Sequence, residues 1–332
     1  MHIPIVYVLI SSGKDIYIPQ AMLSMWSCKY YNKTSPIYVV TDLNTQTKIK
    51  EYSDAESLID RFITKEFEEW VPNIERSRVL KTTLRTLIEG DFLFVDTDTI
   101  FCGEINSEDF KDIETGIVED LHADKICNHP FRNNIQYNIK SVYATELNLE
   151  RIYFNSGCIY SKDCENSYKF FEEWHNNWLI YKEKTGRYFD QPALLQTVNK
   201  YPFLVQPLSG IYNVQIIGCI KYLYKGIILH FFNANWDNED VHPFLNKEYY
   251  KPLLLSKKIN DEIKNDILNC KSLFHVPTFV LGPKQVNLWI SEFGKLIKEI
   301  NQRPSLKKIS SLTFKVLLKS LDMLNNIKNM GG

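Results

Sequence analysis

Hydrophobic runs alternate with amphipathic stretches through the first hundred residues. The runs at 3–10, 36–42 and 92–95 are rich in β-branched and aromatic residues and predict buried strands, and a shorter strand is expected at 61–67. Helical spacing predicts helices over 19–32, 45–59 and 73–90, the last ending at Gly90. Strands and helices in alternation are typical of right-handed βαβ units, so the expected fold class is α/β with a mostly parallel sheet.

The pattern becomes less regular after residue 105. A strand is predicted over 115–121, a strand, turn and strand over 151–163, and a strand leading into a loop over 225–236. Helices are predicted over 165–184 and 190–200. Residues 122–150 are polar and carry few regular signals, which is typical of a mobile loop at a functional site.

The C-terminal tail after Pro304 differs in character. A helical wheel places one broad apolar face opposite Lys308, Lys315 and Lys319; that face consists of Leu306, Ile309, Val316, Leu317, Leu324 and Ile327. A basic amphipathic helix can lie on an anionic membrane surface, so residues 305–328 are a candidate for peripheral membrane contact. The alternative, that this helix docks on the main domain, stays open.

Composition narrows the classes of function. Hydrophobic residues make up 44% of the 332-residue chain and charged residues 24%, which is typical of a globular protein. The formal net charge of -1 argues against a nucleic-acid partner. Seven cysteines with no CxxC spacing argue against a disulfide framework or a zinc site. With no basic leader and no long apolar stretch, the expected location is a reducing cytoplasm.

Two carboxylates follow the predicted strand at 92–95. Asp96 and Asp98 are separated by one residue, and alternate residues of a strand face the same side, so both are expected to point into one pocket at the edge of the sheet. Burying unpaired carboxylates is costly. Their hard oxygen atoms suit Mg²⁺ or Mn²⁺, which would supply the missing charge. The alternative is that they cap a helix or form a turn.

The helix predicted just before this strand carries basic residues opposite its leucine stripe. Arg78 and Lys81 are spaced to share a face and lie near the turn expected to border the pocket. They are candidates for contact with an anionic substrate, whereas a solvated helix surface is the alternative.

The segment at 76–105 resembles the donor site of nucleotide-sugar glycosyltransferases with the GT-A fold. The similarity is closest to the glycogenin and lipopolysaccharide galactosyltransferase family. Three later segments resemble further family motifs in the same order: YFNSGCIYSKD its FNSGV strand, YFDQPALLQ its DQ motif, and ILHFFNANW its histidine segment. The resemblance covers roughly residues 3–236.

This resemblance implies a UDP-sugar donor, Mn²⁺ or Mg²⁺ as cofactor, and a role for each matching residue. His230 would join Asp96 and Asp98 on the metal, although a core histidine is the alternative. Asp190 and Gln191 are the expected catalytic pair near the donor sugar. The remaining expected substrate-binding residues are Asn155 and Ser156 at a sugar-facing turn, Ser11, Ser12 and Gly13 beside the nucleotide, Asp42 at the uridine or ribose, and Asp120. An ordinary turn at 11–13 and a helix cap at Asp42 are the alternatives.

The implied domain layout is a GT-A catalytic domain over residues 1–250 and a C-terminal helical region over 251–332. Within the catalytic domain, residues up to about 105 would bind the nucleotide-sugar and residues 106–250 would face the acceptor.

The histidine segment departs from the family pattern. The family usually continues H-F-x-G-x-x-K-P-W, but residues 230–236 read HFFNANW and lack the Gly and the Lys-Pro. The diphosphate contact of that lysine therefore stays open, with Lys81 or Arg78 as substitutes.

The predicted function is transfer of a hexose to a glycan or lipid-linked acceptor in surface polysaccharide or lipopolysaccharide biosynthesis, at the inner face of the cell membrane. Retention of configuration is expected, with Gln191 near the reacting face. If a carboxylate acts as general base, Glu119 or Asp120 is the candidate and inversion would follow. The alternatives are a sugar nucleotidyltransferase, for which the first loop SSGKD has too few glycines, and a non-catalytic sugar-binding or scaffold protein.

Overall fold

The computed structural model describes residues 3–217, 219–232, 242–273 and 283–303. The chain divides into two units, Met1–Thr278 and Phe279–Gly332, and each is described by itself. The amphipathic helix expected over 305–328 lies outside the described residues.

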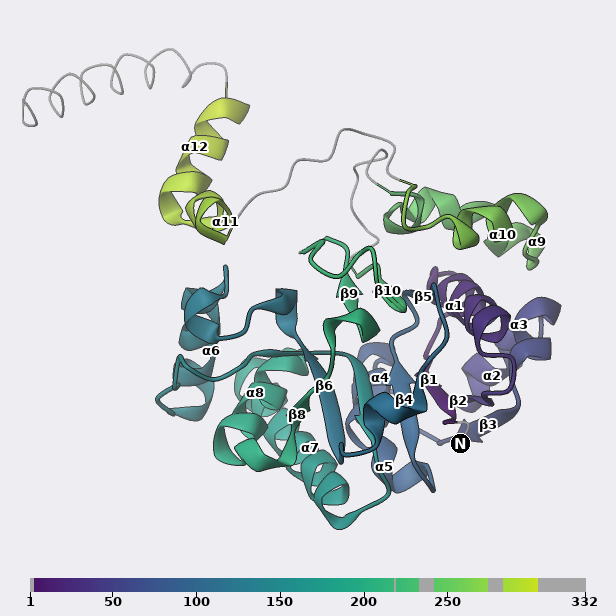
Figure 1. Ribbon diagram of the computed structural model, residues 1–332, viewed down its shortest axis with the longest axis horizontal. Coiled ribbons are helices and arrows are strands. Elements are labelled where there is room, and N and C mark those ends of the chain that lie inside the picture. The colour runs from purple at the N-terminus through teal and green to yellow at the C-terminus, as the bar shows by residue number, and fades with distance from the viewer. Residues whose placement is uncertain (1–2, 218, 233–241, 274–282, 304–332) are drawn as a thin grey trace, which may run out of the picture. The chain divides into compact units, whose positions relative to one another are not determined.

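The first unit is built on a seven-stranded sheet with the order β3-β2-β1-β4-β7-β6-β8 (Figure 1). Neighbouring strands are parallel except β7, which runs antiparallel to both β4 and β6. The mostly parallel α/β sheet predicted from the sequence is therefore confirmed. The strands are β1 (Ile5–Val8), β2 (Ile37–Thr41), β3 (Arg61–Thr64), β4 (Phe92–Val95), β6 (Thr115–Glu119), β7 (Phe154–Ser161) and β8 (Gln206–Pro207).

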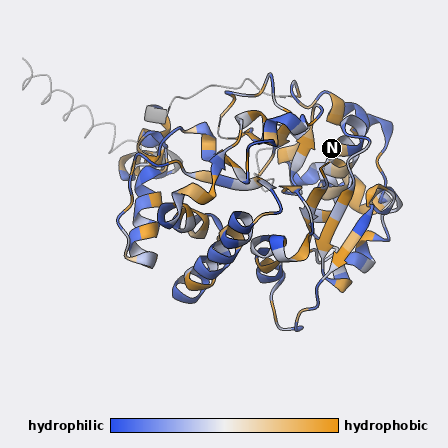
Figure 2. Cartoon of the chain, turned by 60° about the horizontal axis from the view of Figure 1, so that its bottom comes forward, coloured by the Kyte–Doolittle hydropathy of each residue, from blue (hydrophilic) through white to orange (hydrophobic). Residues whose placement is uncertain are grey.

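Helices cover both faces of this sheet, which explains why its central strands are continuous hydrophobic runs. Ile5 and Tyr7 join one core cluster, whereas Val6 and Val8 join the other. Figure 2 shows hydrophobic strands in the sheet between helices whose colour changes around their axes. The first cluster includes α1 (Tyr17–Tyr31), α2 (Leu43–Ile49) and α3 (Ser53–Leu58); the second includes α4 (Asn73–Thr82), α5 (Leu84–Leu87), α7 (Glu165–Thr185) and α8 (Gln191–Lys200).

The helix predicted over 73–90 is two helices, α4 and α5, which break at Thr83. This residue has φ -110° and ψ 13°, outside helical values. The hydroxyls of Thr82 and Thr83 donate to the carbonyls of Arg78 and Val79 at 2.8 and 2.7 Å, a side-chain bond that competes with helix continuation. The helical part ends at Leu87, three residues before the predicted stop, and Gly90 follows in a bend with a φ of +75°. The helix predicted over 45–59 is likewise two, α2 and α3.

Two predictions between residues 122 and 163 are wrong. The stretch predicted as a loop contains α6 (Arg132–Tyr143), whose buried residues Ile135, Ile139 and Val142 follow helical spacing. The strand, turn and strand predicted over 151–163 are replaced by the single strand β7, although Asn155, Ser156 and Gly157 are residue types that favour a turn. Gly157 lies within β7, beside His230. A Cβ at this position would be 2.7 Å from Nδ1 of His230, so the glycine is needed for close packing rather than for a turn.

A second, three-stranded sheet positions His230. It has the order β5-β10-β9, with β5 (Thr99–Phe101), β9 (Val214–Gln215) and β10 (Ile228–His230). The strands β5 and β10 are antiparallel, and His230 pairs with Thr99. The histidine is thereby held beside the segment that carries Asp96 and Asp98.

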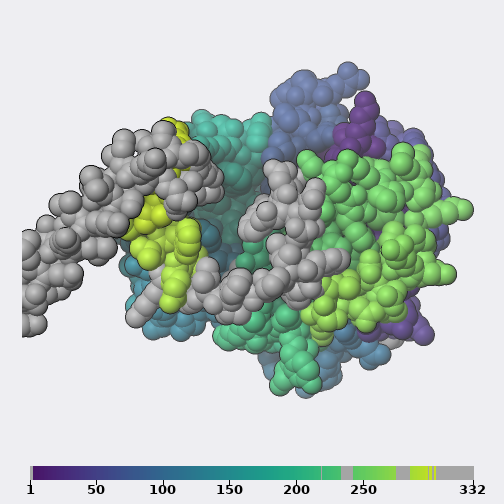
Figure 3. Space-filling model, turned by 90° about the horizontal axis from the view of Figure 1, so that it is seen from above, coloured from purple at the N-terminus to yellow at the C-terminus, as the bar shows by residue number. Residues whose placement is uncertain are grey.

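The first unit continues beyond residue 250, where the sequence placed a domain boundary. Leu253 of α9 (Lys251–Ser256) and Ile263 and Ile267 of α10 (Asp261–Leu268) belong to the same core cluster as α1. Figure 3 shows this segment in bright green against the purple N-terminal part of the chain. These two helices therefore belong to the core of the first unit rather than to a separate C-terminal region.

The described part of the second unit consists of α11 (Pro283–Ile290) and α12 (Glu292–Gln302). Its large exposed apolar residues are Leu288, Trp289, Phe293 and Leu296. Within the described part of the chain, we find no helix with the length and apolar character needed to cross a membrane.

Candidate active site

A pocket of about 790 Å³ lies where β4, β7 and β10 meet the start of α8. An adjoining hollow of about 370 Å³ shares Asp15, Tyr17 and Arg78 with it, as well as both predicted metal-binding aspartates. Of the predicted site residues, the pocket is lined by Arg78, Lys81, Asp96, Asp98, Asp120, Asn155, Ser156, Asp190, Gln191 and His230. Residues from six separate segments of the chain thus meet at one place.

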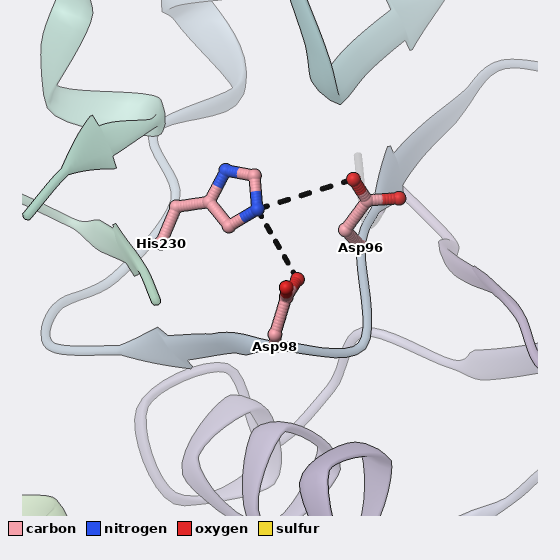
Figure 4. A group of neighbouring side chains, drawn as sticks. All are labelled: Asp96, Asp98 and His230. Carbon is pink, nitrogen blue, oxygen red and sulfur yellow. Dashed lines mark ion pairs between the residues drawn. The ribbon is translucent and has the colours of Figure 1, made fainter. Parts of the chain in front are cut away.

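Asp96, Asp98 and His230 point toward one another (Figure 4). The Nε2 atom of His230 lies 3.1 Å from Oδ1 of Asp98 and 3.9 Å from Oδ2 of Asp96. One ligand atom of each residue falls within 4.8 Å of the others. The sequence predicted that the two aspartates face the same side of one strand, and this is wrong. Asp96 directly follows β4, and Asp98 lies in the turn before β5. This turn, rather than the pleat of a strand, brings the carboxylates together.

This set of donors fits a divalent cation. Burial lowers the pKa of His230, but the nearby Asp98 carboxylate outweighs it and the pKa lies above its ordinary value. Burial raises the pKa of Asp98, and His230 in turn brings it below the ordinary value. Both shifts indicate a position that attracts positive charge. Two carboxylates and an imidazole nitrogen could hold Mn²⁺ or Mg²⁺ there.

Lys81 and Arg78 of α4 enter the pocket and contact carboxylates. The buried Nζ of Lys81 lies 3.0 Å from Oδ1 of Asp96 and 3.3 Å from Oδ2 of Asp190, and Nε of Arg78 lies 3.5 Å from Oδ1 of Asp190. Burial raises the pKa of Asp190, but Lys81 and Arg78 together hold it well below its usual range. Asp190 is therefore an ionised carboxylate inside the pocket.

Ser156 belongs to the same group. Its hydroxyl donates to Oδ2 of Asp190 at 2.9 Å and accepts from Nζ of Lys81 at 3.2 Å. Ser156 and Asp190, which belong to two separate motifs of the family resemblance, are thus in direct contact although they lie 34 positions apart along the chain.

Asp120 is the centre of a second buried group. Its Oδ1 accepts from Nδ2 of Asn155 at 2.8 Å and from Nε2 of Gln191 at 2.9 Å. Its Oδ2 lies 2.9 Å from Nε2 of His129, which must carry the proton because Nδ1 of His129 accepts from the N–H of Phe131. Asp120 thereby fixes the side-chain amides of Asn155 and Gln191. Glu119, the other candidate base, is not among the described residues that line the pocket.

Four predicted substrate-binding residues are not among the described residues that line the pocket: Ser11, Ser12, Gly13 and Asp42. Ser11 and Ser12 donate to the carboxylate of Asp15 at 2.6 and 2.7 Å, which folds the turn around that residue. Their contact with a nucleotide stays a prediction.

Asp42 has the capping role that the sequence left open. It is the N-cap of α2, accepting from the N–H of Thr45 at 2.8 Å, and its other oxygen forms a 2.9 Å ion pair with Arg76. Its contact with uridine or ribose stays a prediction.

Several lining residues carried no clear signal in the sequence. Lys14, Asp15 and Tyr17 follow the serine turn and reach the pocket in place of the serines, and the ring of Tyr17 is 48% exposed. Lys247 lines the pocket from the 3-10 turn Lys247–Tyr250, farther along the chain than the family pattern places its lysine. Asn213 contacts Nδ1 of His230. Asp15 lies in the loop between β1 and α1, and Tyr17 begins α1. A charged and an aromatic residue after the first strand are the local signal for a binding loop here.

No protein-family model matches the chain, and no curated protein sequence matches it. A galactosyltransferase, LgtC, solved in complex with donor and acceptor sugar analogues, superposes with a TM-score of 0.52 at 15% identity over 79% of this chain and 99% of that one. An active-site Gln-to-Glu mutant of LgtC gives a TM-score of 0.50 at 13% identity with the same coverage.

Apo mouse xyloside xylosyltransferase 1 gives a TM-score of 0.48 at 12% identity, over 69% of this chain and 97% of that one. At these identities, the likeness to LgtC concerns the fold. The strand order, the helices on both sides of the sheet and the similarity over nearly all of LgtC agree with the resemblance found in the sequence. The chain therefore has the GT-A fold of nucleotide-sugar glycosyltransferases.

Proposed function

We propose that the protein is a metal-dependent glycosyltransferase that moves a hexose from a UDP-sugar to a glycan or glycolipid acceptor. One observation carries the proposal: the cation position of Asp96, Asp98 and His230 lies in the same pocket as Asp190 and Gln191. A nucleotide-sugar needs a cation for its diphosphate and polar groups for its sugar within one cavity. The GT-A fold of the chain supports the same function.

Different side chains of the pocket would bind different parts of the UDP-sugar donor. A divalent cation held by Asp96, Asp98 and His230 would neutralise charge that develops on the departing diphosphate. The exposed ring of Tyr17 offers a face on which the uracil can stack. Lys247, which is exposed at the rim of the pocket, adds positive charge for the phosphates.

The sugar is oriented by the buried acids and amides. Asp190 is ionised and accepts hydrogen bonds from hydroxyl groups, while the Asp120 group holds Asn155 and Gln191 at fixed positions. Retention of configuration is the favoured course, as the family resemblance implies, and the bonds from Asn155, Gln191 and His129 give Asp120 a positioning role rather than that of a base. A general base for an inverting reaction would need a free carboxylate oxygen beside the acceptor.

The acceptor side of the pocket suits a sugar. Phe131 and Phe189 line it with rings that are 38% and 57% exposed, and the apolar face of a pyranose can pack on such rings. We place the reaction in surface polysaccharide or lipopolysaccharide biosynthesis in the cytoplasm, at the inner face of the cell membrane. The exposed apolar residues of α11 and α12 and the basic amphipathic pattern at 305–328 support peripheral membrane contact.

The test is incubation of the purified chain with Mn²⁺ and a panel of UDP-sugars, with UDP release as the readout. Release of UDP with one sugar, together with transfer to an oligosaccharide acceptor, is the expected result. Formation of a nucleotide-sugar from a nucleoside triphosphate and a sugar phosphate would identify a nucleotidyltransferase. Binding of a sugar without UDP binding or release would identify a non-catalytic protein. The anomeric configuration of the product, measured by NMR, separates retention from inversion.

A further inference from the structure

Asn213 lies fully buried between the cation position and the sugar side of the pocket. Its Oδ1 is 2.9 Å from Nδ1 of His230, and its Nδ2 is 2.9 Å from Oδ1 of Asn155. We propose that Asn213 is a positioning residue that holds the imidazole of His230 in the tautomer with a bare Nε2, and that links this histidine to Asn155. The inference rests on the proposed function in taking the cation position as a metal site.

The orientation of the Asn155 amide follows from two neighbouring groups, one of which can only donate a hydrogen bond and the other only accept one. The backbone N–H of Gly157 can only donate, and it lies 3.0 Å from Oδ1 of Asn155. The carboxylate of Asp120, when ionised, can only accept, and it lies 2.8 Å from Nδ2 of Asn155. The amide of Asn155 is therefore fixed, with its oxygen toward Gly157 and Asn213.

The same reasoning extends to the histidine. Because Oδ1 of Asn155 accepts, the atom of Asn213 that faces it must be the donating Nδ2. Oδ1 of Asn213 then faces Nδ1 of His230 and can only accept, so Nδ1 carries a proton. A neutral imidazole with its proton on Nδ1 has its lone pair on Nε2, the atom nearest to Asp96 and Asp98.

Packing keeps the ring from adopting another orientation. His230 is 3% exposed, and β7 passes so close that a Cβ at Gly157 would be 2.7 Å from its Nδ1. A ring with the proton on Nε2 would instead place two lone pairs against each other at Nδ1 and Oδ1 of Asn213. Partners of this kind outside the metal-ligand shell orient a histidine ligand and tune its affinity.

The two polar atoms of Asn213 can be tested separately. Asn213→Leu removes both hydrogen bonds at similar volume, whereas Asn213→Asp keeps an acceptor for His230 and places a carboxylate against the oxygen of Asn155. In Mn²⁺ titrations followed by electron paramagnetic resonance without a nucleotide, Asn213→Leu is expected to weaken binding about 10- to 100-fold. Asn213→Asp should stay within about threefold of the wild type, because the partner of Nδ1 remains.

The donor sugar supplies the second readout. In Asn213→Asp, the disturbed Asn155 is expected to raise KM for the donor although Mn²⁺ still binds. Mn²⁺ affinity unchanged in Asn213→Leu, or lost equally in both variants, would overturn the proposal. Circular dichroism spectra that match the wild type confirm that both variants are folded.

A direct readout of the tautomer is independent of activity. The ¹⁵N chemical shifts of His230 with the diamagnetic cation Mg²⁺ bound are expected to show a proton on Nδ1 and none on Nε2, because Nε2 otherwise faces the carboxylate of Asp98 at 3.1 Å. A proton on Nε2 would contradict the inference. If the Mn²⁺ and ¹⁵N results hold but no UDP-sugar is turned over, the proposed function fails while the role of Asn213 stands.

Discussion

Lys81 and Asp190 form a buried ion pair of 3.3 Å, and the same ammonium lies 3.0 Å from Asp96. One cation thus stands between a carboxylate of the metal position and the carboxylate expected to bind the sugar. Its charge, together with that of Arg78, offsets the burial of Asp190 and holds the pKa of that carboxyl well below its usual range.

Lys81→Met should expose how much the fold depends on this cation. Removing one partner of a buried ion pair costs on the order of 3 kcal/mol, so the thermal midpoint of the metal-free protein is expected to fall clearly. Saturating Mn²⁺ should restore part of the loss, since it returns positive charge beside Asp96. The matched control is Lys125→Met, which removes an exposed pair with Glu150 and should cost little. Equal losses in the two variants would contradict this role.

Asp98→Asn is expected to weaken Mn²⁺ binding roughly tenfold or more, because a neutral amide replaces an anionic ligand. Chelation with EDTA should abolish turnover of the wild type. Asp112→Asn, at an exposed position, is the control. Calorimetric titration with Mn²⁺ measures the change, and full turnover by Asp98→Asn would show that Asp98 is not a metal ligand.

Lys247→Ala should weaken binding of the donor and leave the stability of the fold unchanged. Loss of a partly screened charge near a diphosphate is worth about 1 kcal/mol, or roughly a fivefold rise in KM for the UDP-sugar. Lys251→Ala is the matched control, because that side chain lies in the adjoining helix and pairs with Glu248. If both variants kept the wild-type KM, the lysine of the family pattern would have no counterpart at position 247.

Asp42→Ala, which removes the side-chain acceptor altogether, distinguishes a helix cap from a substrate contact. Loss of the cap and of the pair with Arg76 should lower the free energy of unfolding by about 1 kcal/mol at neutral pH, with KM for the donor unchanged. A rise in KM would instead support contact with uridine or ribose.

The pH dependence of this variant has a definite sign. Burial raises the pKa of Asp42, but the hydrogen bonds from Thr45 and Arg76 outweigh it and hold the pKa below its ordinary value. Asp42 therefore contributes stability above its unfolded pKa of about 3.9, and this contribution is lost as the pH falls through the lower folded value. The difference in urea unfolding between wild type and variant should shrink in that range.

Membrane contact through the tail can be measured with vesicles. Full-length protein is expected to sediment with anionic liposomes, and a variant with Lys308, Lys315 and Lys319 changed to Gln should bind on the order of 100-fold more weakly, at about 1 kcal/mol per lysine. High salt should reduce binding of the wild type, and neutral liposomes are the control. Binding unaffected by the three changes would favour docking of the tail on the protein.

The sequence predicted the strands and helices whose signals are local. Residues 3–10 and 92–95 are continuous hydrophobic runs because the strands are buried on both faces, and this pattern is visible without any tertiary information. The D-x-D pattern brought forward Asp96 and Asp98, and the family resemblance added Asp190, Gln191 and His230; all five line one pocket. The helix at 132–143 was missed although Ile135, Ile139 and Val142 carry its periodicity, because polar residues dominate the surrounding stretch.

What the chain by itself determined, therefore, is the order of its elements and the residue types available at the ends of its strands. Tertiary structure alone decided which of these side chains meet. The pairing of β5 with β10 places His230 beside Asp98, and Asn213 becomes its partner only after β9 joins the same sheet. The reason is physical: periodicity records which face of an element is buried, whereas a hydrogen bond between residues far apart in sequence depends on how whole strands pack.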